Sequence, residues 1–130
     1  MRQRSFLGVA FHALDNKQLE GIYFRPFNFR ADPPFKTRAV QYISWPENTW
    51  QKLREQKPGV FENAVHPVPD PDGWFHARIE VEAKQVRVFV DNSAEPSLVV
   101  ERLTDRNTGG VGLWADIFDG GFANLKITPK

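Results

Sequence analysis

The stretch Tyr23-Phe-Arg25-Pro-Phe-Asn28 carries the polar and aromatic groups best suited to holding a ligand. Arg25 falls on the same side of an extended strand as Tyr23, because side chains on a strand alternate with period two. Planar guanidinium and amide groups beside an aromatic ring suit sugar hydroxyls, which need paired donors and acceptors. Together with residues of the neighbouring strands, this stretch predicts a ligand-binding set in which Trp45 or Trp50 is the aromatic platform. The set consists of His12, Glu20, Tyr23, Arg25, Asn28, Gln41, Tyr42, Trp45 and Trp50.

Arg25 also has a purely structural interpretation. It could pair with Glu20 or Glu62 and tie neighbouring strands together, because structural ion pairs also place such residues inside β-sandwiches. Both interpretations stay open at this point.

Catalysis of glycoside hydrolysis needs two carboxyl groups roughly 5–10 Å apart across the scissile bond. Glu80-Val-Glu82 places two carboxylates on one strand face, but the row from Arg78 to Lys84 alternates in sign, which is typical of a solvated surface. The remaining acid–base candidates are Glu20, His12 and Glu62, with Arg25 to orient a substrate. They form no convincing pair, so a binding role is favoured over an enzymatic one.

Metal and cofactor chemistry has little support in the residue pattern. The chain has no cysteine, and its three histidines are too scattered to form a sequence-local metal motif. Asp116 and Asp119, beside two glycines, offer oxygen ligands of the kind that calcium takes, although a solvated turn explains them as well. We predict no cofactor.

Length and charge narrow the class of protein. A chain of 130 residues is expected to form one domain, residues 1–130. Lys plus Arg (17) nearly cancels Asp plus Glu (16), so no strong field favours nucleic acid or an anionic membrane surface. No stretch approaches the roughly 20 apolar residues of a membrane span. The first 16 residues faintly resemble a signal peptide but alternate as a strand does, so the compartment stays open.

Hydrophobic periodicity of two dominates the chain and predicts an all-β fold. One short helix is expected near residues 47–56, capped by Asn48 or Thr49 and ended by Pro58-Gly59, followed by a loop over 59–73. Asp91-Asn92 suits a hairpin turn because both residues tolerate positive φ. Strands are predicted at 4–13, 19–24, 37–44, 74–82, 86–90, 98–101, 111–115 and 122–128, which favours an antiparallel β-sandwich or jelly roll.

Several segments together resemble a known superfamily. They are Gly73-Trp-Phe-His-Ala-Arg-Ile-Glu-Val, Val86-Arg-Val-Phe-Val-Asp-Asn, Pro96-Ser-Leu-Val-Val, Gly110-Val-Gly-Leu-Trp and Phe122-Ala-Asn-Leu-Lys-Ile. This series resembles the concanavalin A-like lectin/glucanase superfamily, most of all its laminin-G-like modules and 3-keto-disaccharide hydrolase domains, long called a domain of unknown function. The resemblance implies a jelly roll and a carbohydrate-associated function, either a non-catalytic binding module or a hydrolase of a 3-keto disaccharide or a glucan.

Domains that this chain resembles usually carry one or two strands before the segment that begins here near Arg4. If those strands are missing, a sheet loses a neighbour and an edge opens. A homodimer is one way to cover such an edge, and a structural or protein-interaction role is the third functional hypothesis.

Overall fold

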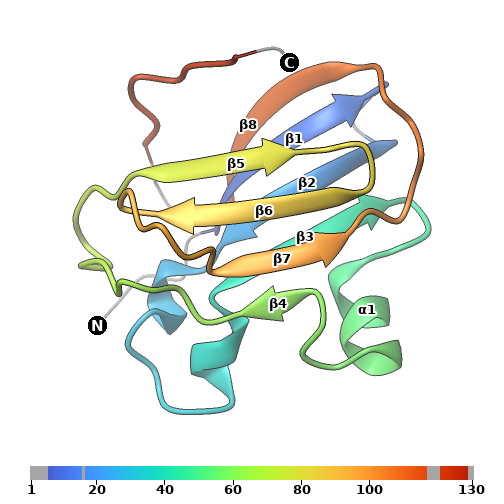
Figure 1. Ribbon diagram of the computed structural model, residues 1–130. Helices are drawn as coiled ribbons and strands as arrows, with labels where there is room; N and C mark the ends of the chain where they lie inside the picture. The colour runs from blue at the N-terminus through green and yellow to red at the C-terminus, as the bar shows by residue number, and fades with distance from the viewer. Residues whose placement is uncertain (1–5, 16, 117–120, 129–130) are drawn as a thin grey trace.

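The computed structural model, which describes residues 6–15, 17–116 and 121–128, is an all-β sandwich of two antiparallel sheets (Figure 1). The larger sheet has the strand order β4-β3-β2-β1-β8 and the smaller has the order β5-β6-β7. The strands are β1 (Phe6–Ala13), β2 (Leu19–Phe24), β3 (Val40–Trp45), β4 (Glu62–Asn63), β5 (Ala77–Val81), β6 (Gln85–Val90), β7 (Leu98–Glu101) and β8 (Gly110–Asp116).

The core lies between the two sheets and follows the predicted alternation. The even-numbered residues Ile22, Phe24, Val40 and Tyr42 of β2 and β3 face the smaller sheet. They meet apolar side chains of β6 and β7, all buried: Val86, Val88, Val90, Leu98 and Val100. Odd-numbered residues of β2 and β3 therefore point to the opposite face, which we call the outer face of the larger sheet.

Short helices lie at one edge of the larger sheet. The α-helix α1 (Trp50–Gln56) begins after Thr49, whose hydroxyl accepts a hydrogen bond from the Lys52 N–H at 3.3 Å, as expected for an N-cap. Two 3-10 helices, η1 (Pro26–Asn28) and η2 (Phe35–Arg38), occupy the connection between β2 and β3. The helix and its Thr49 cap were predicted correctly, and the chain leaves the helix just before Pro58-Gly59.

Several predicted boundaries were wrong, each for a local reason. The strand expected at 37–44 begins only at Val40, because residues 35–38 form η2, and the loop expected at 59–73 contains the short strand β4. The strand expected at 74–82 is confined to β5. Residues 122–128 form no strand despite their alternation, since no described strand pairs with them. Residues 4 and 5 lie outside the described ranges.

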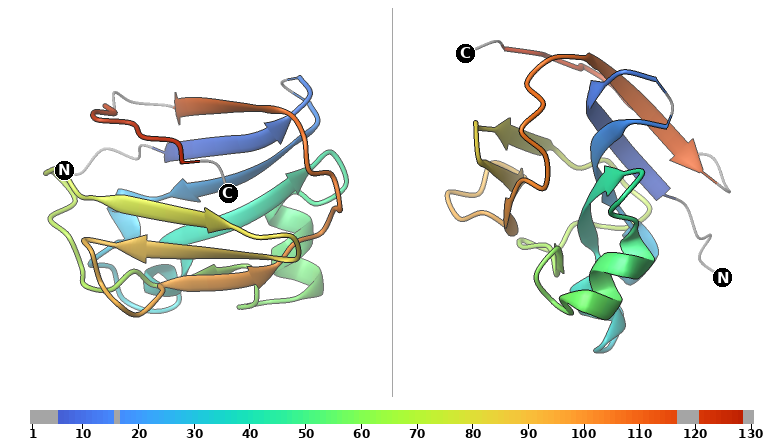
Figure 2. Two further views of the ribbon diagram at one scale, coloured as in Figure 1. Left: turned by 45° about the horizontal axis from the view of Figure 1, so that its top comes forward. Right: turned by 90° about the vertical axis from the view of Figure 1, so that its right-hand side faces the viewer.

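The two sheets differ in width, and this leaves part of the larger sheet uncovered (Figure 2). β1 is not an edge strand, because it pairs with β2 on one side and with β8 on the other. On β8, Val111 and Leu113 point to the same face as the core residues of β1 but remain 47% and 39% exposed. In the smaller sheet, β5 and β7 are the edge strands among the described residues.

Candidate functional site

The residues predicted to bind ligand form two separate groups on opposite faces of the larger sheet. Glu20 and Tyr42 are even-numbered and lie on the core side, whereas Tyr23 and Gln41 are paired on the outer face. His12 joins the core-side group because β1 is irregular between Ala10 and Ala13 and His12 has a φ of 49°. The predicted ligand-binding set is therefore divided between two faces of the sheet and does not form one surface.

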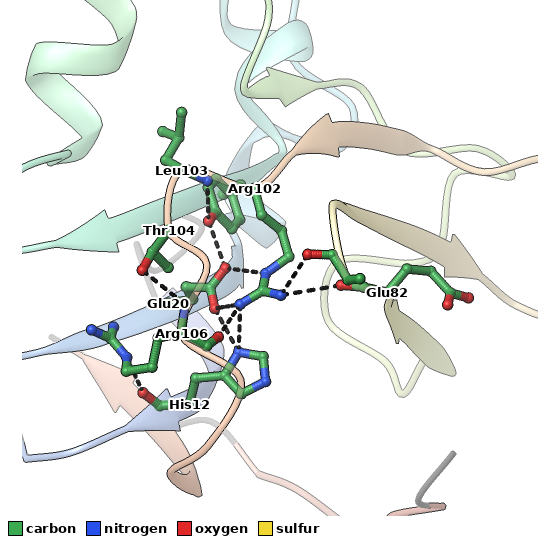
Figure 3. Close-up of polar contacts among 9 residues, drawn as sticks. His12, Glu20, Glu82, Arg102, Leu103, Thr104 and Arg106 are labelled. Atoms are coloured by element: carbon green, nitrogen blue, oxygen red, sulfur yellow. Dashed lines mark hydrogen bonds and ion pairs between the residues drawn. The ribbon is translucent and has the colours of Figure 1, made fainter.

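Glu20 is the centre of the core-side group, which we call the Glu20 cluster (Figure 3). Its side chain is fully buried. Its carboxylate accepts hydrogen bonds from Tyr42 Oη–H at 2.7 Å and from Arg102 Nε and Nη2 at 2.8 Å each, and it is hydrogen-bonded to His12 Nδ1 at 2.6 Å. Arg102, only 3% exposed in its side chain, also donates to the carbonyl oxygens of Glu82 and Ala83 in the β5–β6 turn. The cluster therefore fastens the larger sheet to the smaller one.

The electrostatics of the Glu20 cluster favour the ionised form of Glu20. Burial alone would raise the pKa of Glu20, but hydrogen bonds from Arg102, His12 and Tyr42 outweigh it and hold that pKa below its ordinary value. Burial, together with the nearby Glu20 charge, raises the pKa of Tyr42. A proton donor for glycoside hydrolysis needs a raised carboxyl pKa, so Glu20 is poorly suited to act as a general acid.

Arg25 organises the outer-face group, which we call the Arg25 network. Its Nη2 donates to Tyr23 Oη at 2.7 Å and to Gln41 Oε1 at 2.6 Å, and Tyr23 Oη–H donates to Gln41 Oε1 at 2.8 Å. Arg25 Nη1 lies 3.7 Å from Glu62 Oε1, and Asn28 shares with Arg25 the carbonyl oxygen of Arg38 as an acceptor. Of the two partners weighed for Arg25, Glu62 was right and Glu20 was wrong.

The Arg25 network is enclosed in the protein. Arg25, Asn28 and Glu62 are at most 7% exposed, and Gln41 is fully buried. Burial raises the pKa of Tyr23 to about 12 and lowers that of Arg25. These groups bond mainly to one another and offer few free donors or acceptors to a ligand. Their predicted role as direct ligand contacts is therefore replaced by a supporting one.

The Arg25 network supports Trp50 through Glu62. Both oxygens of Glu62 accept hydrogen bonds from Arg54, each at 2.7 Å, and the Arg54 guanidinium lies over the Trp50 ring, 5.0 Å from its centroid. The Glu62–Arg54 pair is therefore bidentate, and the same guanidinium makes a cation–π contact with Trp50. Gln41 Nε2 also donates to the Trp50 carbonyl at 3.4 Å. These contacts fix both the backbone and the ring of Trp50, while 44% of the residue stays exposed.

Trp45 lies at the other end of the same turn. The turn of residues 46–49 is closed by two backbone hydrogen bonds between Ser44 and Asn48, at 3.0 and 2.7 Å. Trp45 is 38% exposed and borders an open groove of about 330 Å³. The residues that line this groove are Lys17, Trp45, Pro46 and Thr49. The lining surface of the groove is almost entirely apolar, and the Thr49 hydroxyl beside it already accepts the N-cap hydrogen bond from Lys52.

A larger open hollow, of about 600 Å³, lies at the β5–β6 turn and the end of β7. It is lined by residues 83–85 and 101–105, which include no aromatic side chain. A sugar ring needs an aromatic surface to stack on as well as polar groups, so the Trp45 groove is the better candidate for a carbohydrate.

Sequence reasoning missed Trp114 on the outer face. The Trp114 ring lies directly over Gly8 and Gly21, where an added Cβ would stand 2.3 Å and 2.9 Å from ring atoms. The ring also contacts Tyr23, with centroids 6.0 Å apart. Glycine in the middle of a strand often marks such a close approach, and this was the available signal. Arg102 was missed too, because it is separated from Glu20 by 82 residues.

Of the three acid–base candidates, the two carboxylates, Glu20 and Glu62, cannot face each other across a substrate. Glu20 lies on the core face, whereas Glu62 pairs in register with Gln41 on the outer face. Each is also bonded to at least one arginine. The arrangement gives neither inverting nor retaining geometry.

In the described ranges, no group of three or more His, Asp or Glu side chains is placed to hold a metal ion. The proposed calcium ligand Asp119 lies outside the described residues, as does the side chain of Asp116. Among the described helices, none is long and apolar enough to cross a membrane. Comparison of the chain with protein-family models, with curated proteins and with solved structures gave no match.

Proposed function

We propose that this domain is a non-catalytic carbohydrate-binding module whose ligand lies in the Trp45 groove and against Trp50. The observation that carries the proposal is the pair of exposed tryptophans at the two ends of the 46–49 turn, of which Trp45 lines an open groove. An indole face contributes contact area with few rotatable bonds, which keeps the entropic cost of binding low.

Preorganisation of Trp50 is the second support. The Glu62–Arg54 pair fixes the guanidinium on one side of the indole, so the ring is oriented before any ligand arrives. In this proposal, Arg25, Gln41 and Glu62 are positioning residues. The proposed membership of the concanavalin A-like superfamily, based on the sequence resemblance above, is consistent with such a function at the level of fold.

A hydrolase acting on a 3-keto disaccharide or a glucan is less well supported. The candidate carboxylates lie on opposite sides of a sheet and are ion-paired, and the pKa of Glu20 is shifted away from that of a general acid. No described feature favours that hypothesis over binding.

A panel of neutral and acidic oligosaccharides, titrated into the chain by calorimetry, tests the proposal. One glycan class should bind, and Trp45→Ala and Trp50→Ala should each weaken binding at least about tenfold, equivalent to about 1.4 kcal/mol. Trp74→Ala is the matched control, because Trp74 is 75% exposed but lies outside the groove. Arg54→Met should weaken binding while leaving the far-ultraviolet circular dichroism spectrum unchanged.

Two results would contradict the proposal. A folded chain that binds no member of the panel has no carbohydrate function of this kind. If a glycan is instead cleaved, and Glu20→Gln abolishes cleavage but not binding, the domain is a hydrolase.

A further inference from the structure

The strand β5 has a free edge. Within the part of the chain that the structure describes, β5 pairs with β6 on one side and with no strand on the other (Figure 1). An unpaired edge offers a row of N–H and C=O groups to any strand of matching register. This edge belongs to the smaller sheet, away from the Trp45 groove, so it is independent of the proposed carbohydrate function.

The hydrogen bonds to β6 determine which β5 groups are available. Glu82 N–H donates to the Gln85 carbonyl, and Asp91 N–H donates to the His76 carbonyl. Even-numbered residues of this hairpin therefore direct their backbone groups toward β6. Ala77, Ile79 and Val81 direct theirs to the free edge, so an incoming antiparallel strand must bond to these three residues.

Side chains of β5 alternate in a way that complements a second copy of itself. Ala77, Ile79 and Val81 face the core side, and the opposite side carries Arg78, 51% exposed in its side chain, and Glu80, 28% exposed. Three two-fold registers keep at least two of Ala77, Ile79 and Val81 bonded to one another across the pair, and only the one centred on Ile79 keeps all three. One centres on Arg78 and another on Glu80, and each of these puts like charges opposite one another.

The third register centres on Ile79 and has no such conflict. Arg78 of each copy lies opposite Glu80 of the other, His76 lies opposite Glu82, and the apolar residues meet on the core side. Opposite charges in facing positions stabilise an antiparallel pair, whereas like charges destabilise it. The side-chain pattern of β5 therefore selects one register of self-pairing.

We propose that β5 is a dimerisation edge, at which two copies of this chain pair antiparallel about Ile79 and join their three-stranded sheets into one. Such an interface is isologous, because the same residues meet on both sides of the two-fold axis. It also covers Ile79 and Val81, which are only partly buried at the margin of the core. The C-terminal segment 121–128 is a poorer partner, because its one charged residue, Lys126, gives Arg78 no acidic counterpart.

Charge reversal tests both the edge and the register. Arg78→Glu gives a strand with only acidic groups at positions 78 and 80, and Glu80→Arg gives one with only basic groups. Each variant alone should raise the dimer dissociation constant about tenfold or more in sedimentation equilibrium, because like charges then face each other twice. An equimolar mixture of the two should form a heterodimer, since every facing pair is again opposite in sign.

The mixing experiment separates lost pairing from lost folding, because a misfolded variant is not rescued by a second misfolded variant. The double variant R78E/E80R should dimerise on its own. Leu113→Lys on the β8 edge serves as the control and should leave the dimer intact. A wild-type chain that stays monomeric at all concentrations, a mixture that fails to associate, or a dimer lost only in Leu113→Lys would each overturn the proposal.

Discussion

Replacing Arg102 with methionine should destabilise the domain more than any surface change. Arg102→Met removes two charge-assisted hydrogen bonds to Glu20, each 2.8 Å long, and leaves a fully buried carboxylate held only by Tyr42 and His12. Breaking a buried pair by removing one partner costs about 3–5 kcal/mol. At roughly 3–5 °C per kcal/mol for a chain of this size, the midpoint of thermal unfolding should fall by about 10–20 °C.

The double variant tells whether this cost comes from the unpaired charge. Glu20→Gln/Arg102→Met buries no charge at this position, so it should be more stable than the sum of the single changes predicts, by about 2 kcal/mol or more. Urea unfolding of the four proteins of this cycle, followed by circular dichroism, gives the coupling energy. Additivity within about 0.5 kcal/mol would refute the argument, since it would mean that Glu20 and Arg102 act independently.

The pH dependence of the same cycle has a definite sign. Because the folded-state pKa of Glu20 is lowered, its contribution to stability is present above its ordinary value of 4.5 and is lost as pH falls below it. The wild-type chain should therefore lose more stability between neutral pH and pH 4 than the double variant does. Equal losses in the two proteins would show that Glu20 is not the responsible group.

Two further predictions concern the packing of Trp114 and the burial of the two tyrosines. Gly8→Ala should lower the free energy of unfolding by about 1–3 kcal/mol, because its Cβ would stand 2.3 Å from the Trp114 ring. Gly112→Ala is the control and should cost much less, because an added Cβ there would meet no atom within 4 Å. Thermal unfolding compares the two variants, and equal costs would contradict the close packing of Trp114. The pKa of Tyr23 is raised to about 12 and that of Tyr42 is raised as well, and these are the only tyrosines. The folded chain at pH 10.5 should therefore show little tyrosinate absorbance, in contrast to the chain in urea, and half-ionised tyrosines in the folded chain would argue against their burial. Since stability that depends on a raised pKa is lost above the unfolded value, the domain should weaken as pH rises from 10 toward 12.

The sheets were predictable because their signals are local. Val86, Val88 and Val90 recur with period two and are fully buried, and Asp91 and Asn92 adopt the positive φ angles of 51° and 60° expected of the turn. Period-two alternation requires no knowledge of the partner strand. The strand predicted at 122–128 does not form, because an alternating pattern gives a strand only where a neighbouring strand is available to pair with it.

The site was harder to predict because faces and partners are set by distant residues. Strand periodicity alone separates Glu20 from Tyr23, but it does not say which side faces the core; in the folded protein Glu20 lies with Tyr42 on the core side and Tyr23 lies with Gln41 on the outer face. The partner of Glu20 lies 82 residues away in Arg102, beyond the reach of any spacing argument. Trp45 or Trp50 was predicted as the aromatic platform from residue type and position alone, and the structure adds that both side chains are partly exposed.

The positions of the groove and of the β5 edge have a consequence for binding strength. The groove lies at the end of β3, beside the β1–β2 connection and the 46–49 turn, and β5 borders the smaller sheet, so we expect pairing of two copies through β5 to leave both grooves accessible. A polymeric glycan that reaches both would bind its second groove at a high effective concentration. Avidity could then exceed the affinity of a single groove by about 10²–10⁴, which suits a shallow site whose intrinsic hold on one sugar unit is weak.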